Sequence, residues 1–265
     1  MNLQELLESI SAIARNAGAA ILDVYQRADH GVRFKDDASP LTHADLAAHD
    51  IINAALSRLT PQLPVLSEES AGIPWSVRRE WTRYWLVDPL DGTKEFINRN
   101  GEFTVNIALV EHGVPVLGVV FAPVQNVLYG GAAQIGAWKE QAGQRERIRT
   151  VSINEGQGKL RVVASRRHAG EELEAWLARL QQRFPDLELL SMGSSLKICL
   201  VAEGRADIYP RLAPTCEWDT AAAQAVLEAA GGLLTDTKFT PYRYNAKEAL
   251  LNPHFLALGD AGFRP

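Results

Sequence analysis

The chain is poor in several features that would narrow its class at once. Among 265 residues it has only two cysteines, Cys199 and Cys216, each within apolar sequence, which predicts free thiols in a reducing compartment rather than a disulfide framework. No run of eighteen apolar residues is present, so no segment is expected to span a membrane. The start of the chain lacks the basic residues and apolar run of a signal peptide, because Glu5 and Glu8 lie there. The expected location is therefore cytoplasmic.

An excess of one charge is also missing. The 27 basic and 32 acidic residues are spread without a block of like sign, which argues against a partner such as a nucleic-acid polymer. A small anionic ligand would instead need a local group of basic residues. The hydrophobic share of 46% is enough for the core of one large domain or of two smaller ones.

Two common motifs of phosphate chemistry are absent. The sequence has no Gly-x-x-x-x-Gly-Lys-Ser/Thr loop, so a nucleotide hydrolase of the P-loop class is not expected. Aspartyl-phosphate phosphatases need a second aspartate two positions after the nucleophile at the end of a strand. The residue two positions after Asp88 is Leu90, so the chain is not expected to be an aspartyl-phosphate phosphatase either.

Apolar spacing predicts two helices and then an antiparallel meander. Residues Leu3–Val24 keep the spacing of three and four that marks one face of a helix, and a second helix is expected at about Ala44–Leu59. A strand at Tyr84–Val87 should end at Asp88, because the proline that follows cannot donate to a ladder. Further strands are expected at Val65–Leu66, Phe103–Leu109, Val114–Phe121 and Val127–Tyr129.

The second half of the chain instead alternates strand and helix, which predicts an α/β layer. The expected elements are Leu160–Ala164, Glu171–Arg183, Leu187–Leu190, Ser195–Glu203 and Ala206–Tyr209. The polar segment Gln141–Arg149 and the stretch around Gly156 and Gly158 are the candidate boundaries. We therefore expect an N-terminal α+β domain at residues 1–148 and a C-terminal α/β domain at 149–265 that carries Asp219.

The chemistry concentrates in residues 88–93, Asp-Pro-Leu-Asp-Gly-Thr. Asp88 and Asp91 lie on a proline and glycine turn, so their charges would repel unless a cation sits between them. Oxygen ligands without nearby histidine or cysteine favour Mg²⁺ over zinc, and the Leu90 carbonyl and Thr93 hydroxyl offer further oxygens. The alternative for this hexapeptide alone is a tight turn in which Thr93 caps a short helix.

Three separated motifs together resemble the inositol monophosphatase superfamily of lithium-sensitive phosphatases. They are Glu68-Glu69, residues 88–93 and Trp218-Asp219-Thr220-Ala221-Ala222, in that order and at that spacing. Within the superfamily the chain is most similar to the CysQ branch, whose members are 3'(2'),5'-bisphosphate nucleotidases of sulfur metabolism. The segments that carry this similarity are Leu66–Ser70, Lys94–Ile97, Arg99–Leu109 and Gly193–Lys197. The resemblance runs from about Lys35 to Asn252, which is nearly the whole chain.

The resemblance implies a fold and a metal site. The fold would be a layered αβαβα sandwich with the site where the two halves meet. Glu68, Asp88 and the Leu90 carbonyl would hold one Mg²⁺, while Asp88, Asp91 and Asp219 would hold a second, with two or three ions in total. An alternative role for Asp219 is to cap a helix at Thr220–Ala230, which Gly231 would end.

The resemblance also assigns the catalytic and substrate-binding residues. Thr93 and Asp45 would orient a water and help to deprotonate it, so that no covalent phosphoenzyme forms. Gly193-Ser194-Ser195 precedes a helix whose free N–H groups would attract phosphate, although an ordinary serine cap is the alternative. The residues expected to contact substrate are Glu68, Leu90, Asp91, Gly92, Thr93, His168, Ser194, Lys197, Arg211 and Asp219. One departure from the family is Ala223, where glycine is usual.

The expected reaction is Mg²⁺-dependent hydrolysis of adenosine 3',5'-bisphosphate to AMP and phosphate. An inositol or sugar monophosphatase with the same metal site is the alternative enzyme. A nucleotide-binding regulator that has lost turnover is the alternative from another class, and the full set of acidic residues argues against it. Some members of this branch are described as peripheral to the cytoplasmic face of the inner membrane, so that association is a second expectation. The sequence does not fix the oligomeric state.

Overall fold

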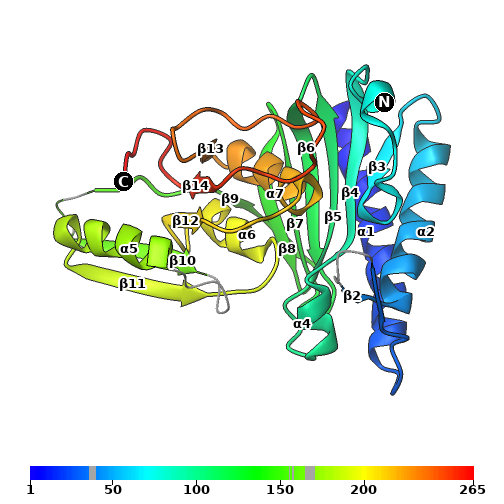
Figure 1. Cartoon of the computed structure of the whole chain (residues 1–265), viewed down its shortest axis with the longest axis horizontal. Coiled ribbons are helices and arrows are strands. Elements are labelled where there is room, and N and C mark those ends of the chain that lie inside the picture. Colours follow the sequence, from blue (N-terminus) through cyan, green and yellow to red (C-terminus); the bar gives the residue numbers. More distant parts are fainter. Residues whose placement is uncertain (36–39, 155, 157, 165–170) are drawn as a thin grey trace.

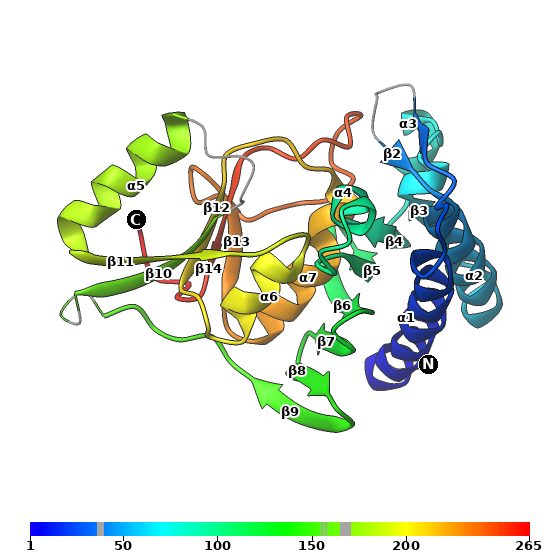
Figure 2. The same ribbon diagram turned by 90° about the horizontal axis from the view of Figure 1, so that it is seen from below.

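The computed structural model describes residues 1–35, 40–154, 156, 158–164 and 171–265, and these form five layers (Figure 1). Helices α1 (Leu3–Tyr25) and α2 (His43–Leu59) cover one face of a seven-stranded sheet. Helices α6 (Leu196–Ala202) and α7 (Glu217–Ala229) separate this sheet from a five-stranded sheet, and α5 (Glu171–Arg183) covers the far side. The same order is visible from below (Figure 2), which confirms the predicted αβαβα sandwich.

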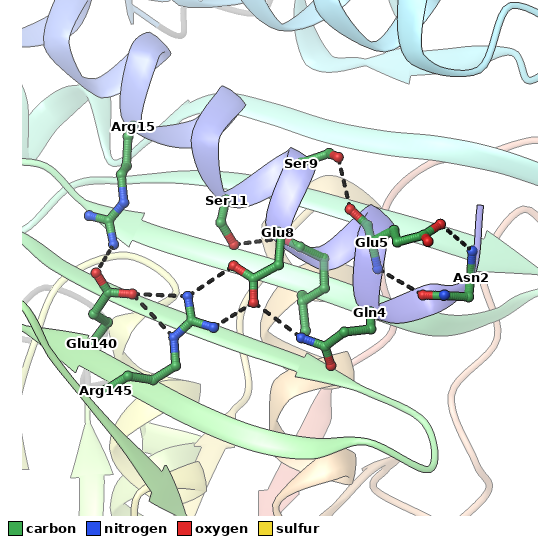
Figure 3. Close-up of polar contacts among 10 residues, drawn as sticks. Asn2, Gln4, Glu5, Glu8, Ser9, Ser11, Arg15, Glu140 and Arg145 are labelled. Atoms are coloured by element: carbon green, nitrogen blue, oxygen red, sulfur yellow. Dashed lines mark hydrogen bonds and ion pairs between the residues drawn. The ribbon is translucent and has the colours of Figure 1, made fainter.

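Helix α1 shows why this sequence folds locally as it does. Its buried face is apolar at the predicted spacing. Asn2 and Glu5 form a capping box, in which each side chain accepts the other residue's backbone N–H. Arg145 then bridges Glu8 of α1 and Glu140 of the sheet, as Figure 3 shows. These contacts fix the helix across the strands.

The seven-stranded sheet contains the predicted meander and two more strands. Its spatial order follows the chain, with β3 parallel to β4 and all other neighbours antiparallel. The strands are β3 (Val65–Ser67), β4 (Arg83–Asp91), β5 (Thr104–Glu111), β6 (Val114–Ala122), β7 (Val127–Ala132), β8 (Gly136–Gln141) and β9 (Gln144–Ile148).

The prediction that a strand ends at Asp88 is wrong, because β4 continues through Pro89 to Asp91. The pairing of β4 with β5 is irregular between Asp88 and Asp91. A strand tolerates proline at such an irregularity, because no hydrogen bond of the ladder there needs the N–H that proline lacks.

The five-stranded sheet has the order β11-β10-β12-β14-β13. Strands β11, β10 and β12 are parallel, as the alternation of strand and helix predicts, and the last two neighbours are antiparallel. The strands are β10 (Lys159–Ala164), β11 (Asp186–Ser191), β12 (Ile208–Arg211), β13 (Leu233–Asp236) and β14 (Phe255–Leu258). Short elements complete the described chain: β1 (Arg33–Phe34), β2 (Pro40–Leu41), the 3-10 helix η1 (Glu68–Ser70), α3 (Trp75–Arg78) and α4 (Thr93–Ile97).

The connection between the two sheets runs from the end of β9 at Ile148 to the start of β10 at Lys159. Most of Gln141–Arg149 is not a linker, because β9 forms the edge of the first sheet. The second sheet begins at Lys159, yet α7 from the C-terminal half packs against the first sheet. The division into residues 1–148 and 149–265 therefore stays a prediction.

Helix α7 approaches the first sheet closely because small residues face each other there. A Cβ on Gly118 of β6 would lie 2.3 Å from the Ala222 carbonyl oxygen, and one on Gly131 of β7 would lie 2.7 Å from the Val226 Cα. Ala223, the departure from the family pattern, is fully buried in the same helix. This contact sets the position of the N-terminal turn of α7, which carries Asp219.

Candidate active site

Three carboxylates meet where the two halves of the chain come together. Asp88 and Asp91 lie at the irregular end of β4, and Asp219 lies in the first turn of α7. One oxygen from each carboxylate lies within 4.8 Å of the other two. The spacing fits a shared divalent cation, because hard ions bind several carboxylate oxygens at once.

The backbone at the end of β4 explains how Asp88 and Asp91 share one side. In a regular strand, residues three apart point to opposite faces, and the irregularity between these two residues removes that constraint. The Leu90 N–H donates to Oδ1 of Asp88 at 3.0 Å and orients it. Gly92 then adopts φ 95°, a left-handed conformation that favours glycine, and α4 begins at Thr93.

The electrostatics of the three carboxylates favour a bound cation. Burial raises the pKa of Asp88 well above its ordinary value, and the nearby carboxylates of Glu68, Asp91 and Asp219 raise it further. Burial and the charge of Asp91 raise the pKa of Asp219 to about 8. Without a positive partner, Asp88 and Asp219 would favour their protonated forms, whereas a bound cation would favour the ionised ones.

Asp219 does not take its alternative role as the N-cap of the helix. Helix α7 begins at Glu217 and Cys216 is its N-cap, so Asp219 is the third helical residue. Its Oδ2 accepts the Cys216 N–H at 2.8 Å, as the acidic member of a capping box does. The predicted helix start is therefore wrong by three residues, whereas Gly231 follows the helix as predicted, with φ 104°.

Glu68 adjoins this group but has a cationic partner of its own. It begins η1 directly after β3, and its Oε1 lies 2.7 Å from the Lys35 Nζ, which is also 2.8 Å from Oε1 of Glu69. Burial raises the pKa of Glu68, with Lys35 opposing the shift and Glu69 adding to it. Sequence reasoning did not assign Lys35 a role, because its only signal is a position at the start of the similar region.

Asp45 and Thr93 come together beside the three carboxylates. The Thr93 hydroxyl lies 3.3 Å from Oδ1 of Asp45 and 3.4 Å from the Leu90 carbonyl oxygen. Asp45 is 2% exposed, and Thr42 donates to its other carboxylate oxygen. The predicted pair is thus in contact, although its catalytic role stays a prediction.

A cavity of about 200 Å³ joins the acidic group to basic side chains of the second half of the chain. Its lining includes the acidic residues Asp91 and Asp219 and the basic residues Lys197 and Arg211. Of the predicted residues, those that line it are Asp91, Gly92, Ser194, Lys197, Arg211 and Asp219. His168 lies outside the described residues. Sequence reasoning missed Glu95, Asn100, Glu102, Tyr209 and Thr215, which also line the cavity.

Two of these lining residues are poised for an anionic ligand. Lys197 is 8% exposed, and its Nζ lies 5.6 Å from the centre of the Tyr209 ring. Burial lowers the pKa of Lys197 to about 8, although Asp91 opposes the shift. Ser194 has φ 46°, and its buried hydroxyl has no hydrogen-bond partner within the described ranges. A bound phosphate would supply partners for both.

Comparison with known proteins identifies the family. Residues 2–259 match the inositol monophosphatase family. The chain belongs to this family. Among its relatives is the 3'(2'),5'-bisphosphate nucleotidase CysQ of Escherichia coli O157:H7, which is 53% identical over 251 residues that cover 94% of this chain and 98% of that protein.

Solved structures give the same result. The chain superposes on CysQ from Bacteroides thetaiotaomicron with a TM-score of 0.84 and 44% identity, covering 96% of this chain and 97% of that one. It superposes on an inositol monophosphatase from Anabaena (Nostoc) sp. PCC 7120 with a TM-score of 0.74 and 28% identity, covering 98% and 92%. In the described part of the chain, no helix combines the length and apolarity that a membrane crossing requires.

Proposed function

We propose that the protein hydrolyses adenosine 3'(2'),5'-bisphosphate to AMP and phosphate with the help of Mg²⁺. One observation carries the proposal: a single cavity is lined by acidic residues able to hold a metal and by basic residues able to hold a second phosphate. The high identity to bisphosphate nucleotidases supports the choice of substrate.

The chemistry of the acidic residues fits Mg²⁺. Their donors are oxygens alone, and burial and then repulsion raise the pKa of Asp88 and of Asp219 in a way that a cation would relieve. Glu68, Asp88 and the Leu90 carbonyl would hold one ion, and Asp88, Asp91 and Asp219 a second, with a third as a further expectation. When bound, such ions lower the pKa of water and stabilise charge on the attacking and leaving oxygens.

The protein residues then handle the water and its proton. The Thr93 hydroxyl can donate to Asp45, which leaves the threonine oxygen free to accept a hydrogen bond from the attacking water. Asp45 is buried and held by Thr42, so it is fixed in place to take up the proton that the water loses. The water attacks phosphorus directly, and no covalent phosphoenzyme is formed.

The basic side of the cavity would select the substrate. Lys197 and Arg211 would bind the phosphate that is not hydrolysed, and Ser194 would donate to it or to the ribose. His168 is a further expected contact. A substrate with one phosphate, such as an inositol or sugar monophosphate, would leave the cation of the buried Lys197 without a partner.

Phosphate release from adenosine 3',5'-bisphosphate and from an inositol monophosphate, each with saturating Mg²⁺, tests the proposal. We expect a higher kcat/KM for the bisphosphate and no hydrolysis in excess EDTA. A strong preference for inositol phosphate would instead favour the monophosphatase alternative, which the similarity to the Anabaena inositol monophosphatase supports. Binding of the bisphosphate without turnover would point to a regulator.

Several finer properties belong to the same proposal. Inhibition by lithium and a role in sulfur metabolism are expected from the family. Neither Cys199 nor Cys216 forms a disulfide, which fits the expected reducing, cytoplasmic location. Peripheral association with the inner membrane is a further expectation, which co-sedimentation with membranes would test.

A further inference from the structure

Ser195 connects residues from both sides of the acidic group. It is 3% exposed and directly precedes α6. Its N–H donates to Oδ2 of Asp91 at 2.6 Å, and its Oγ lies 2.8 Å from the same oxygen and 2.6 Å from the Asp219 carbonyl oxygen. One serine therefore ties the end of β4 to the first turn of α7.

Asn106 determines how the hydroxyl of Ser195 can be used. It is 1% exposed in β5, directly across the ladder from Asp88. Its Nδ2 donates to the Ser195 Oγ at 2.9 Å, so it occupies an acceptor site of that oxygen. The single hydroxyl proton is then directed toward Asp91 or the Asp219 carbonyl. Removal of Asn106 would leave the hydroxyl free to rotate.

Ser195 also supports Ser194, which lines the cavity. Ser194 adjoins Ser195 and has φ 46°, a conformation that costs free energy outside glycine. On its other side, a Cβ on Gly193 would lie 2.7 Å from the Glu102 carbonyl oxygen, so the backbone fits closely there too. The fixed N–H and hydroxyl of Ser195 therefore help to hold Ser194 in the conformation that lines the cavity.

We propose that Ser195 and Asn106 are positioning residues that couple the metal ligands Asp91 and Asp219 to the substrate wall at Ser194. The inference rests on the proposed function, since it assumes a metal at the acidic group. Residues that orient metal ligands in this way typically account for about 10- to 100-fold in metal affinity. A metal bound to Asp91 would also hold Ser194 more firmly in place for substrate.

Calorimetric titration of the substrate-free protein with Mn²⁺ tests the proposal. We expect Ser195→Ala, which keeps the backbone bond to Asp91 but loses the hydroxyl, to weaken Mn²⁺ binding by about 10-fold or more. Asn106→Ala should weaken Mn²⁺ binding less than Ser195→Ala does. The double variant should bind Mn²⁺ about as weakly as Ser195→Ala alone, because Asn106 acts through the Ser195 hydroxyl. The KM for the bisphosphate should rise in both variants.

Ser11→Ala is the matched control. Ser11 is 4% exposed, and its hydroxyl donates to the Leu7 carbonyl within α1, far from the acidic group in sequence. It should leave Mn²⁺ affinity unchanged. A merely structural role for Ser195 would give that same pattern. Should Ser195→Ala fail to fold, Asn106→Ala alone carries the test.

The outcomes separate this inference from the proposed function. Tight Mn²⁺ binding by the wild type and equal binding by folded Ser195→Ala would overturn the positioning role alone. Failure of the wild type to bind Mn²⁺ or Mg²⁺ would overturn the metal site and the coupling together. Weaker binding in the Ser195 and Asn106 variants, with Ser11→Ala unchanged, would establish the coupling.

Discussion

The Thr93 hydroxyl lies 3.3 Å from Oδ1 of Asp45, a carboxylate whose other oxygen is held by Thr42 through its N–H at 2.7 Å and its hydroxyl at 2.6 Å. Burial raises the pKa of Asp45, Thr42 opposes the shift, and Glu69 adds to it. Asp45 is thus rigidly placed and has an enhanced affinity for a proton, which suits a residue that accepts one from water through Thr93.

We therefore expect Asp45→Asn to lower kcat by about 10²- to 10⁴-fold while Mg²⁺ binding persists. The amide keeps the size of the side chain but cannot accept the proton. Steady-state kinetics with saturating Mg²⁺ measure the loss, and titration calorimetry checks the metal. Because the two residues act as a pair, the double variant with Thr93→Ala should lose no more than the worse single variant.

Asp50→Asn is the control for this prediction, since Asp50 lies on an exposed position of the same helix. It should leave kcat unchanged. A kcat for Asp45→Asn within about threefold of the wild type would contradict the base role that general acid–base catalysis requires.

Lys35 should matter most when metal is absent. Its ammonium lies 2.7 Å and 2.8 Å from Glu68 and Glu69, and burial alone would lower its pKa, yet the two carboxylates reverse the shift and raise it. Lys35→Met should reduce the free energy of unfolding in EDTA by about 1 to 3 kcal/mol, since it leaves two carboxylates without their counter-charge. Saturating Mg²⁺ should recover most of the loss, because a cation near Glu68 replaces the missing charge.

The comparison variant is Lys159→Met, which removes an exposed pair with Glu188 at 2.9 Å. A surface pair of this kind contributes little to stability, with or without metal, because water and salt screen it. Urea unfolding in EDTA and in Mg²⁺ gives all of these values. A loss for Lys35→Met that is equal in both conditions would show that Lys35 is a purely structural partner of the glutamates.

The sequence predicted the acidic group more completely than its surroundings. Asp88 and Asp91 could be found because they are three apart in one motif, and Asp219 because the family resemblance supplied it. The helices followed from apolar spacing, which is a local property. Lys35 and Ser195 could not be found in this way, because their partners lie 33 and 104 positions away and nothing local marks a long-range hydrogen bond.

The errors in the element boundaries have the same origin. Pro89 was expected to end a strand, but the irregular pairing of β4 with β5 accommodates it. The start of α7 was misplaced because Asp219 is as suitable for a capping box as for an N-cap, and the choice depends on the backbone of Cys216. Both cases are decided by tertiary pairing rather than by local propensity.

Lys197 should give kcat/KM a pH dependence. Its pKa is lowered from 10.5 to about 8, first by burial, so in the free enzyme it loses its charge as pH rises through about 8. We expect kcat/KM for the bisphosphate to fall across this range in saturating Mg²⁺, which keeps the carboxylates ionised. Lys197→Arg should remove the decline, because a guanidinium stays charged.

The same shift has an opposite effect on stability. Between pH 8 and 10.5 the unfolded chain holds the Lys197 proton more tightly than the folded protein. The contribution of this group to the free energy of unfolding should therefore rise with pH in that window. Lys197→Met should remove this rise and lower kcat/KM below pH 8. A wild-type kcat/KM that stays level from pH 7 to 9.5 would contradict a charged Lys197 in substrate binding.

The close contact between α7 and the first sheet should control metal affinity at a distance. A Cβ on Gly118 would lie 2.3 Å from the Ala222 carbonyl oxygen, so Gly118→Ala must displace α7 or the strand. We expect a stability loss of about 1 to 3 kcal/mol from overpacking. We also expect weaker Mn²⁺ binding, because Asp219 moves with the first turn of this helix. Urea unfolding and Mn²⁺ titration of the same samples measure both effects.

Ala223→Gly changes the same helix without introducing a steric clash. Ala223 is fully buried in the interior of α7, so the substitution should cost about 1 kcal/mol of helix propensity. It should leave Mn²⁺ affinity unchanged, because nothing forces Asp219 to move. The two variants thus separate loss of stability from displacement of a ligand. Equal Mn²⁺ affinity in Gly118→Ala and Ala223→Gly would show that the contact between α7 and the first sheet does not determine the position of Asp219.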